Sequence, residues 1–555
     1  MGDLLDQPVL DQTTLPAVLA LVAQLRTEVS QLRDDVARLQ RDNQCLKQEV
    51  GYWKAMRARA IERLEATQQE RDQLAGENLQ LKADLFGRRC EKSSTLDRTN
   101  DLEDPQLNRP VRRRGQQPQR PGPKRRDYSH LPIREECVEL PEDQRRCPCC
   151  HAPFVDCGTE DSEQIEIETE VYRRVIHRRR YRRACVCAGP LTQTAPPPAK
   201  LIPKSLFGTS VWVEILLDKY ATHRPTQRLL KAWELLDFDV AAGTITEGLC
   251  RLTPLFAGLY DIIRERNGLS PVVQADETRW KVFEVVDGKT GHTWWLWVFV
   301  GKDTTVYILD VSRSSDAPEA HLGGSQGKLV VDRYSAYKAL SVVKDGRLIL
   351  AFCWAHVRRD FVRVGRGWPE RKEWALAWLR RIRVLYRLNG QRLAAPTDSE
   401  RQMALRDAVA AMQRQYQAEL AADSSIGIPA RKVMVSLDEH WQGLTHFVDD
   451  PRIPMDNNLS ERSLRGAALG RKNYYGSVSQ WSGQLAAMMF TLLATLTRWK
   501  INPRRWLSWY LDSCAQAGGK APANVSSFLP WNITPQKLQE LRQDPAPADL
   551  DPDTS

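Results

Sequence analysis

The chain has 555 residues, a formal net charge of +10 and 27% charged residues. This length exceeds what one hydrophobic core normally supports, so we expect three or four folding units. The longest apolar stretch, residues 485–496, is too short to cross a bilayer, and the N-terminus has no signal-peptide pattern, which argues against a membrane or secreted protein. The positive charge favours polyanionic partners without identifying them. We therefore predict a cytoplasmic, multidomain α+β protein.

A coiled coil that dimerises the protein is predicted over residues 15–90. Two interleaved positions of a seven-residue repeat are apolar: Val22, Val29, Val36, Asn43 and Val50 at the first, and Leu25, Leu32, Leu39, Leu46 and Trp53 at the second. β-branched residues at one position and leucine at the other favour a parallel two-stranded coil, in which a polar Asn43 fixes the register. We expect a homodimer or a higher assembly; a helix folded back on its own domain is the alternative.

A basic, proline-rich linker is predicted over residues 91–130. Residues 109–126 hold eight basic residues and no acid. Such a segment could follow a DNA backbone, but a solvated tether explains the composition equally well.

A zinc-binding domain is predicted over residues 131–200, because cysteines cluster there in a pattern that suits tetrahedral Zn²⁺. The expected ligands are two close pairs of thiols, Cys147, Cys150, Cys185 and Cys187. Cys149, His151 and Cys157 are competing ligands, and a group of unliganded core cysteines is the alternative. Between the pairs, residues 164–185 alternate apolar and polar side chains, which predicts a β-hairpin. Its second strand is rich in arginine and could contact phosphate through Arg178, Arg179 and Arg180, or form a solvated edge.

A helical segment follows over residues 201–268. Its short helices and Gly243-containing turn could form a DNA-binding helix-turn-helix, although ordinary helical packing is favoured on the pattern alone.

The region 269–500 predicts a mixed sheet of about five strands with helices, which is a ribonuclease-H-like α/β arrangement. Asp276 and Asp332 each close an apolar run and are expected at strand ends. The first and fourth strands of this arrangement are adjacent, so the two aspartates should meet at one edge of the sheet. Residues 368–447 predict a helical insertion, followed by Glu461 on a helix. An ion pair with Arg465, four residues on, is the alternative role for that glutamate.

The remaining chain offers less information. Residues 501–540 are predicted to form a C-terminal element, and residues 541–555 an acidic, disordered tail.

Three acids on separate elements suit a site for divalent cations, because two hard cations about 4 Å apart must share converging carboxylate oxygens. The segments QADET, VVDRYSAY, FCWAHVRRDF and DNNLSERSLRGAALGRKNYYGS, in this order, resemble the core of the insertion sequence 66 family of bacterial transposases. LFGRRCEKSS, CPCC, KYATHRPTQR and FLPWNITPQ resemble its other blocks, so the resemblance spans most of residues 20–535. The chain departs from the family at Arg333, where glycine is more common, and in the tight spacing of Cys185 and Cys187.

The resemblance implies a DDE transposase in which Asp276, Asp332 and Glu461 bind two Mg²⁺ ions, which Mn²⁺ could replace. One ion would activate water or a 3′-hydroxyl, and the other would stabilise the leaving oxygen. The implied substrate is double-stranded DNA, both transposon ends and target, and accessory proteins of the same element are a further expected partner. Expected DNA contacts come from the basic residues around the acids, which are otherwise ordinary solvated charges: His356, Arg359, Arg462, Arg465, Arg471 and Lys472. A DNA-binding regulator of the same ancestry that no longer cleaves is the rival function.

Overall fold

The structure is a computed structural model that describes most of the chain. The described residues are 14–86, 133–135, 145, 149, 151–153, 162, 164–165, 169–182, 184, 188, 190, 192–287, 291–422 and 427–542. The predicted linker, the four predicted zinc thiols and nearly all of the predicted tail lie outside these residues. The chain divides into two units, of which one comprises residues 1–94, 363–375 and 427–429 and the other comprises the rest.

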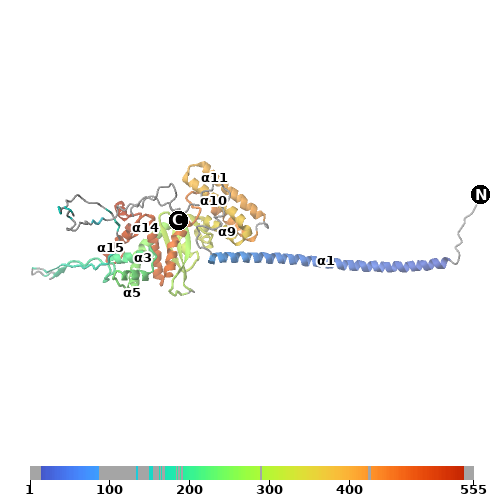
Figure 1. Cartoon of the computed structure of the whole chain (residues 1–555), viewed down its shortest axis with the longest axis horizontal. Coiled ribbons are helices and arrows are strands. Elements are labelled where there is room, and N and C mark those ends of the chain that lie inside the picture. Colours follow the sequence, from blue (N-terminus) through green and yellow to red (C-terminus); the bar gives the residue numbers. More distant parts are fainter. Residues whose placement is uncertain are drawn as a thin grey trace, which may run out of the picture. The chain divides into compact units, whose positions relative to one another are not determined.

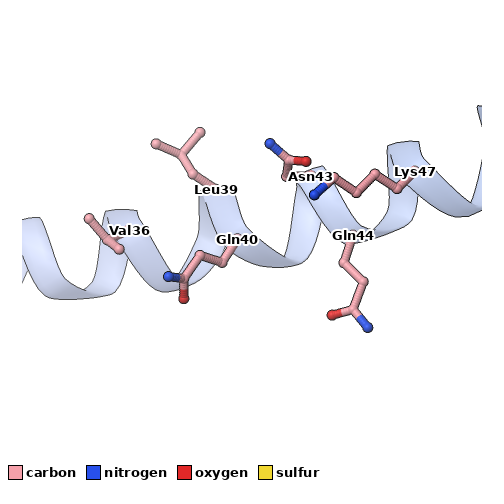
Figure 2. A pocket seen from close by; sticks show the side chains of 6 residues that line it. All are labelled: Val36, Leu39, Gln40, Asn43, Gln44 and Lys47. Atoms are coloured by element: carbon pink, nitrogen blue, oxygen red, sulfur yellow. The ribbon is translucent and has the colours of Figure 1, made fainter.

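The N-terminal region is one continuous helix, α1, which spans Thr14–Phe86 (Figure 1). The helix continues through residues 51–64, where the heptad pattern is interrupted. The apolar residues of the heptad pattern are exposed, for example Leu39 at 63% and Trp53 at 66%. Figure 2 shows Leu39 and Asn43 on one side of the helix and Gln40 and Gln44 on the other. The predicted helix is confirmed, and its apolar stripe has no cover within the described chain.

A five-stranded mixed sheet forms the centre of the second unit. Its strands lie in the order β5-β4-β3-β6-β7. They are β3 (Val272–Lys281), β4 (Thr293–Val300), β5 (Thr305–Asp310), β6 (Gly327–Val331) and β7 (Leu348–Phe352). β3 pairs antiparallel with β4 and parallel with β6, which confirms the predicted adjacency of the first and fourth strands.

Asp276 does not end a strand, contrary to the prediction. It lies within β3, where every residue from Gln274 to Lys281 has a partner on β4. The strand continues through the polar segment DETR because an aromatic-rich neighbour supplies its hydrogen bonds and its cross-strand contacts.

Helices account for most of the remaining described chain. Those before, within and directly after the sheet are α3 (Thr209–Tyr220), α4 (Thr226–Glu234), α5 (Ala242–Gly268), α6 (Asp316–Leu322), α7 (Ser335–Lys338), α8 (Ser341–Lys344) and α9 (Trp354–Gly367). The predicted insertion contains η3 (Pro369–Arg371), α10 (Lys372–Ala394), α11 (Ser399–Ala421) and α12 (Ile428–Asp449). The last elements are α13 (Asn458–Tyr474), α14 (Gln480–Arg498), α15 (Pro503–Gln516), η4 (Val525–Phe528) and α16 (Pro535–Leu541).

Two of these helices cover one face of the sheet. The buried ring of Trp280 on β3 packs against Tyr474 of α13 and Phe490 of α14, with ring centroids 6.3 and 6.0 Å apart. Thr491 and Thr495 of α14 accept hydrogen bonds from the backbone of β5 at 2.9 and 3.2 Å. The apolar run at residues 485–496 is therefore a buried helix against the sheet. Among the described residues, no helix combines the length and apolar character needed to cross a membrane.

The helical segment 201–268 packs onto this domain. α3 contacts α14 and α15, and α5 contacts α14. The loop after α3 also reaches α13, because Asn473 donates to the carbonyl oxygen of His223 at 2.8 Å. α3 and α5 therefore pack into the core of the second unit.

The predicted hairpin between the cysteine pairs is not confirmed by the described residues. β1 (Arg180–Arg182) pairs antiparallel with β2 (Thr192–Thr194), which follows the second cysteine pair. The described residues 169–179 form no strand. Among the described residues, the partner of β1 is the threonine-rich segment after the cysteines. Residues 166–168, in the predicted first strand, lie outside the described residues.

Candidate active site

Asp276 and Asp332 occupy equivalent positions next to each other. β3 and β6 run parallel, with Gln274 paired to Val330. Each aspartate lies two residues beyond its paired residue, so both side chains fall on the same side of the sheet. Neighbouring strands are about 4.8 Å apart, so this register brings the two carboxyl groups together.

The electrostatic environment of Asp276 reflects this crowding. Burial is the largest cause that raises the pKa of its carboxyl, to about 7, and the charge of the adjacent Glu277 is the next. Glu461 and Asp332 raise the pKa further, while the backbone N–H of Glu277, which donates to Asp276 Oδ1 at 2.9 Å, lowers it. The three predicted acids therefore share one electrostatic environment.

Glu461 reaches this environment from the first turn of α13. The start of the helix is fixed by Asn457, whose side chain donates to the carbonyl oxygen of Ala275 at 2.6 Å and whose backbone N–H donates to Cys353 Sγ at 3.1 Å. Since Ala275 precedes Asp276, this contact ties the beginning of α13 to β3 beside the aspartate. The motif DNNLSE thus places a helix start, and the glutamate one turn later, against the strand.

Glu461 is ion-paired to α9. Its Oε1 lies 3.3 Å from Arg359 Nη2 and 3.8 Å from His356 Nε2. Within the described chain, these are its ion pairs, and Arg465 is not among them. The local pairing considered from the sequence is therefore wrong, because residues about a hundred positions earlier in the chain approach the glutamate more closely.

His356 lies among charges of both signs. Burial is the main cause that lowers the pKa of its imidazole, and Arg359 lowers it as well, while Glu461 and Asp332 oppose the shift. The ring is held on α9 directly after β7, and its Nδ1 is buried without a hydrogen-bond partner in the described structure. A neutral imidazole is thus favoured next to the acids.

Arg333, the departure from the family pattern, also contacts α9. Its guanidinium forms an ion pair with Asp360 and donates to Ser436 of α12 at 2.8 Å. This arginine connects the end of β6 to α9 and to the helical insertion. A glycine at this position could make neither contact.

The basic residues predicted on α13 differ in their surroundings. Arg471 donates to Thr278 Oγ1 at 3.1 Å and to the carbonyl oxygen of Arg279, so it fastens the helix to β3. Arg462, Arg465 and Lys472 are exposed. These three remain available for an external partner.

Outside the domain core, Arg178, Arg179 and Arg180 are exposed. Arg178 donates to the carbonyl oxygen of Ala195 at 2.9 Å and Arg180 to Thr192 Oγ1 at 3.3 Å, so two of the three also stabilise the small β1–β2 sheet. The four predicted zinc ligands are outside the described residues, and the described Cys149 is exposed.

Sequence reasoning missed Glu277 and Asn457. The Glu277 side chain is 2% exposed, accepts from Tyr337 at 2.9 Å and pairs with Arg313 at 2.5 Å. Its position next to Asp276 in ADET was the available signal, since two acids in succession on a buried strand require a compensating cation. The asparagines of DNN were a comparable signal for a helix start.

The donor chemistry of the site suits a hard divalent cation, because Asp276, Asp332 and Glu461 offer carboxylate oxygens. Gln274 Oε1 and Asn457 Oδ1 are buried nearby without hydrogen-bond partners in the described structure. However, no three His, Cys, Asp or Glu side chains in the described part of the chain are grouped so that they could hold an ion.

The fold and the site define an α+β protein with a cluster of acids at the junction of two parallel strands and a helix. Comparison with known families places it further: the model of the family described as Transposase IS66 family matches residues 204–485. The chain belongs to the IS66 family of transposases.

Three relatives come from Sinorhizobium fredii (strain NBRC 101917 / NGR234). The uncharacterized protein y4jD is 30% identical over 429 residues, which cover 73% of this chain and 80% of the relative. The uncharacterized protein y4qI is 28% identical, with 76% of this chain and 80% of the relative covered. The uncharacterized protein y4hP is 26% identical, with 69% and 73% covered.

Proposed function

We propose that this chain is a DNA transposase that binds the terminal inverted repeats of an insertion sequence and carries out metal-dependent strand cleavage and strand transfer. The observation that carries the proposal is the equivalent placement of Asp276 and Asp332 on adjacent parallel strands, with the helix of Glu461 tied to the same strand by Asn457. The strand order supports a ribonuclease-H-like assignment of the sheet, since the first strand lies between the second and the fourth.

Asp276, Asp332 and Glu461 would hold two Mg²⁺ ions, which Mn²⁺ could replace. When bound, the ions supply the activation of the attacking oxygen and the neutralisation of charge on the transferring phosphoryl group. The raised pKa of Asp276 is consistent with this role, because a cation would relieve the repulsion among the acids.

The surrounding cations would bind and orient DNA. Arg359 and His356 stand beside Glu461 and would contact a phosphate near the acids. Arg462, Arg465 and Lys472 would contact the backbone from the exposed side of α13, whereas Arg471 would keep α13 in position. Arg178, Arg179 and Arg180 would contact phosphates on the DNA ends, close to a Zn²⁺ site formed by Cys147, Cys150, Cys185 and Cys187.

The exposed apolar stripe of α1 supports assembly of a homodimer or higher oligomer. Valine and leucine side chains half exposed along one helix suit a second copy of the same helix. Two copies would bring two active sites to the two ends of one element, with accessory proteins of that element as further partners.

The test is a cleavage and strand-transfer assay with terminal-repeat DNA and Mg²⁺. Asp276→Ala should abolish both steps, while Asp345→Asn, an exposed surface aspartate paired with Arg347, should leave them unchanged. DNA binding by the wild type without metal-dependent cleavage of any terminal-repeat substrate would refute the transposase and favour the non-cleaving regulator.

A further inference from the structure

We propose that a second DNA-contacting surface lies on the sheet face opposite α13. It consists of Lys281, Arg279, Trp295, Arg313 and Tyr334, named here the basic–aromatic strip. The proposal rests on the proposed function, since it assigns a path for the DNA strand away from the acids. None of these residues is among the expected contacts on α9, on α13 or in the arginine-rich segment.

The alternation of β3 separates this face from the one that α13 covers. Thr278 and Trp280 point toward α13, because Arg471 donates to Thr278 and the Trp280 ring packs on Tyr474. Side chains at odd positions therefore point to the other face, which holds Glu277, Arg279 and Lys281. Arg279 and Lys281 are exposed, so this face is accessible to solvent toward the end of β3, away from Asp276.

Rings and guanidinium groups alternate across this face. Arg279 lies directly opposite Trp295 on β4, with its guanidinium carbon 5.8 Å from the indole centroid. The Arg313 guanidinium carbon lies 4.7 Å from the same ring and 3.9 Å from the ring of Tyr334. Stacked contacts of this kind hold flat groups at a fixed spacing, which suits contacts with bases and phosphates.

The net charge of the strip is positive. The buried carboxylate of Glu277 neutralises Arg313, whose side chain is 40% exposed. Neither Arg279 nor Lys281 pairs with an acid in the described part of the chain. Asp310, the acid opposite Trp295 on β5, accepts hydrogen bonds from Ser312. With the Asp310 carboxylate counted against Arg279 and Lys281, one net positive charge remains beside a half-buried tryptophan, which complements a polyanion better than an apolar protein surface.

The strip begins at the active site. The backbone N–H of Tyr334 donates to Asp332 Oδ1 at 2.9 Å, and the Tyr334 hydroxyl donates to the carbonyl oxygen of Arg313 at 2.9 Å. β6 ends at Val331, so β3 has no neighbour on that side beyond Gln274, and a DNA strand whose phosphate lies at the acids could pass around the end of β6 to Tyr334, Trp295 and Arg279 on the other face. Because the strip continues from the active site, we assign it to the DNA substrate and not to an unrelated protein partner.

The experiment measures the affinity of the full chain for a DNA duplex of about 30 base pairs by fluorescence anisotropy at several salt concentrations without divalent metal. The double variant Arg279→Gln/Lys281→Gln should bind about five- to tenfold more weakly. Its plot of log affinity against log salt should be shallower by about 1 to 2, since each lost phosphate contact removes about 0.9 from the slope. Trp295→Leu should weaken binding and leave the slope unchanged.

The matched control is Lys344→Gln/Arg347→Gln, which removes the same charge from exposed positions before β7. These residues lie at the opposite end of the parallel strands from the acids, so affinity and slope should equal those of the wild type. If Arg279→Gln/Lys281→Gln binds the duplex with the wild-type affinity and slope, the strip does not contact DNA, and the proposed function remains intact. A wild type that binds no duplex at any salt concentration would overturn both.

Discussion

Arg359 Nη2 lies 3.3 Å from Glu461 Oε1, so the helix glutamate is paired with a cation that follows the last strand of the sheet. The same glutamate raises the pKa of Asp276, so its negative charge also acts on that aspartate. Without a divalent cation, Arg359 balances part of the negative charge. An ion at the acids would compete with Arg359 for Glu461.

Arg359→Gln should therefore tighten Mn²⁺ binding in the absence of DNA. A partly exposed ion pair contributes about 0.5 to 1 kcal/mol, which corresponds to about a two- to fivefold change in affinity. Electron paramagnetic resonance of free Mn²⁺ during titration measures this directly, with Arg347→Gln as the surface control. Weaker or unchanged Mn²⁺ binding in Arg359→Gln would show that the pair does not oppose the metal. Cleavage should fall in the same variant if Arg359 also contacts DNA.

The pKa of Asp276 predicts a pH-dependent stability. Its folded value of about 7 lies above the ordinary value of 3.8, so the folded state holds this proton more tightly. The resulting stabilisation is complete below the ordinary value and is lost as pH rises through about 7. Asp276→Asn cannot ionise, so in buffer with a chelator it should be more stable than the wild type at about pH 8, by about 2 kcal/mol.

The measurement is thermal unfolding of both proteins between about pH 5 and pH 8. The advantage of Asp276→Asn should shrink toward low pH, and Mg²⁺ should raise the melting temperature of the wild type more than that of the variant. Asp345→Asn, at the exposed surface, should show neither effect. An advantage of Asp276→Asn that does not change with pH would contradict the assigned shift.

The proximity of Asp276 and Asp332 could be predicted because the succession of strands and helices indicated a ribonuclease-H-like arrangement, in which the first and fourth strands are adjacent. The place of Asp276 within β3 could not, since the strand continues through DETR only because β4 provides its partners. Local rules likewise favoured Arg465 as the partner of Glu461, whereas tertiary packing selects Arg359 and His356. The pairing of β1 with β2 could not be predicted, because the apolar and polar alternation favoured the preceding segment as the partner of the arginine-rich strand.

Gly466 has little room for a side chain. A Cβ atom there would lie 2.6 Å from His223 Nε2, and the His223 loop is held by Asn473. Gly466→Ala should therefore lower the free energy of unfolding by about 1 to 3 kcal/mol despite the higher helix propensity of alanine. Gly390→Ala is the matched control, because this exposed glycine within α10 has no atom within 4 Å of the added Cβ. Thermal unfolding should show a loss for the first variant and a gain for the second; equal gains would refute the contact.

The apolar stripe of α1 predicts self-association through this helix. Leu32 and Leu39 are each 63% exposed and occupy the same heptad position, so a parallel partner would bury both. Leu32→Asp/Leu39→Asp should place charges in that interface and convert the full chain to a monomer in light scattering. Arg41→Asp adds an acid to the opposite side of the helix and should leave the assembly intact. Asn43→Val should stabilise the oligomer or change its order, because a buried polar residue at this position costs stability while fixing the register. A dimer that persists in the double leucine variant would place the main interface outside α1.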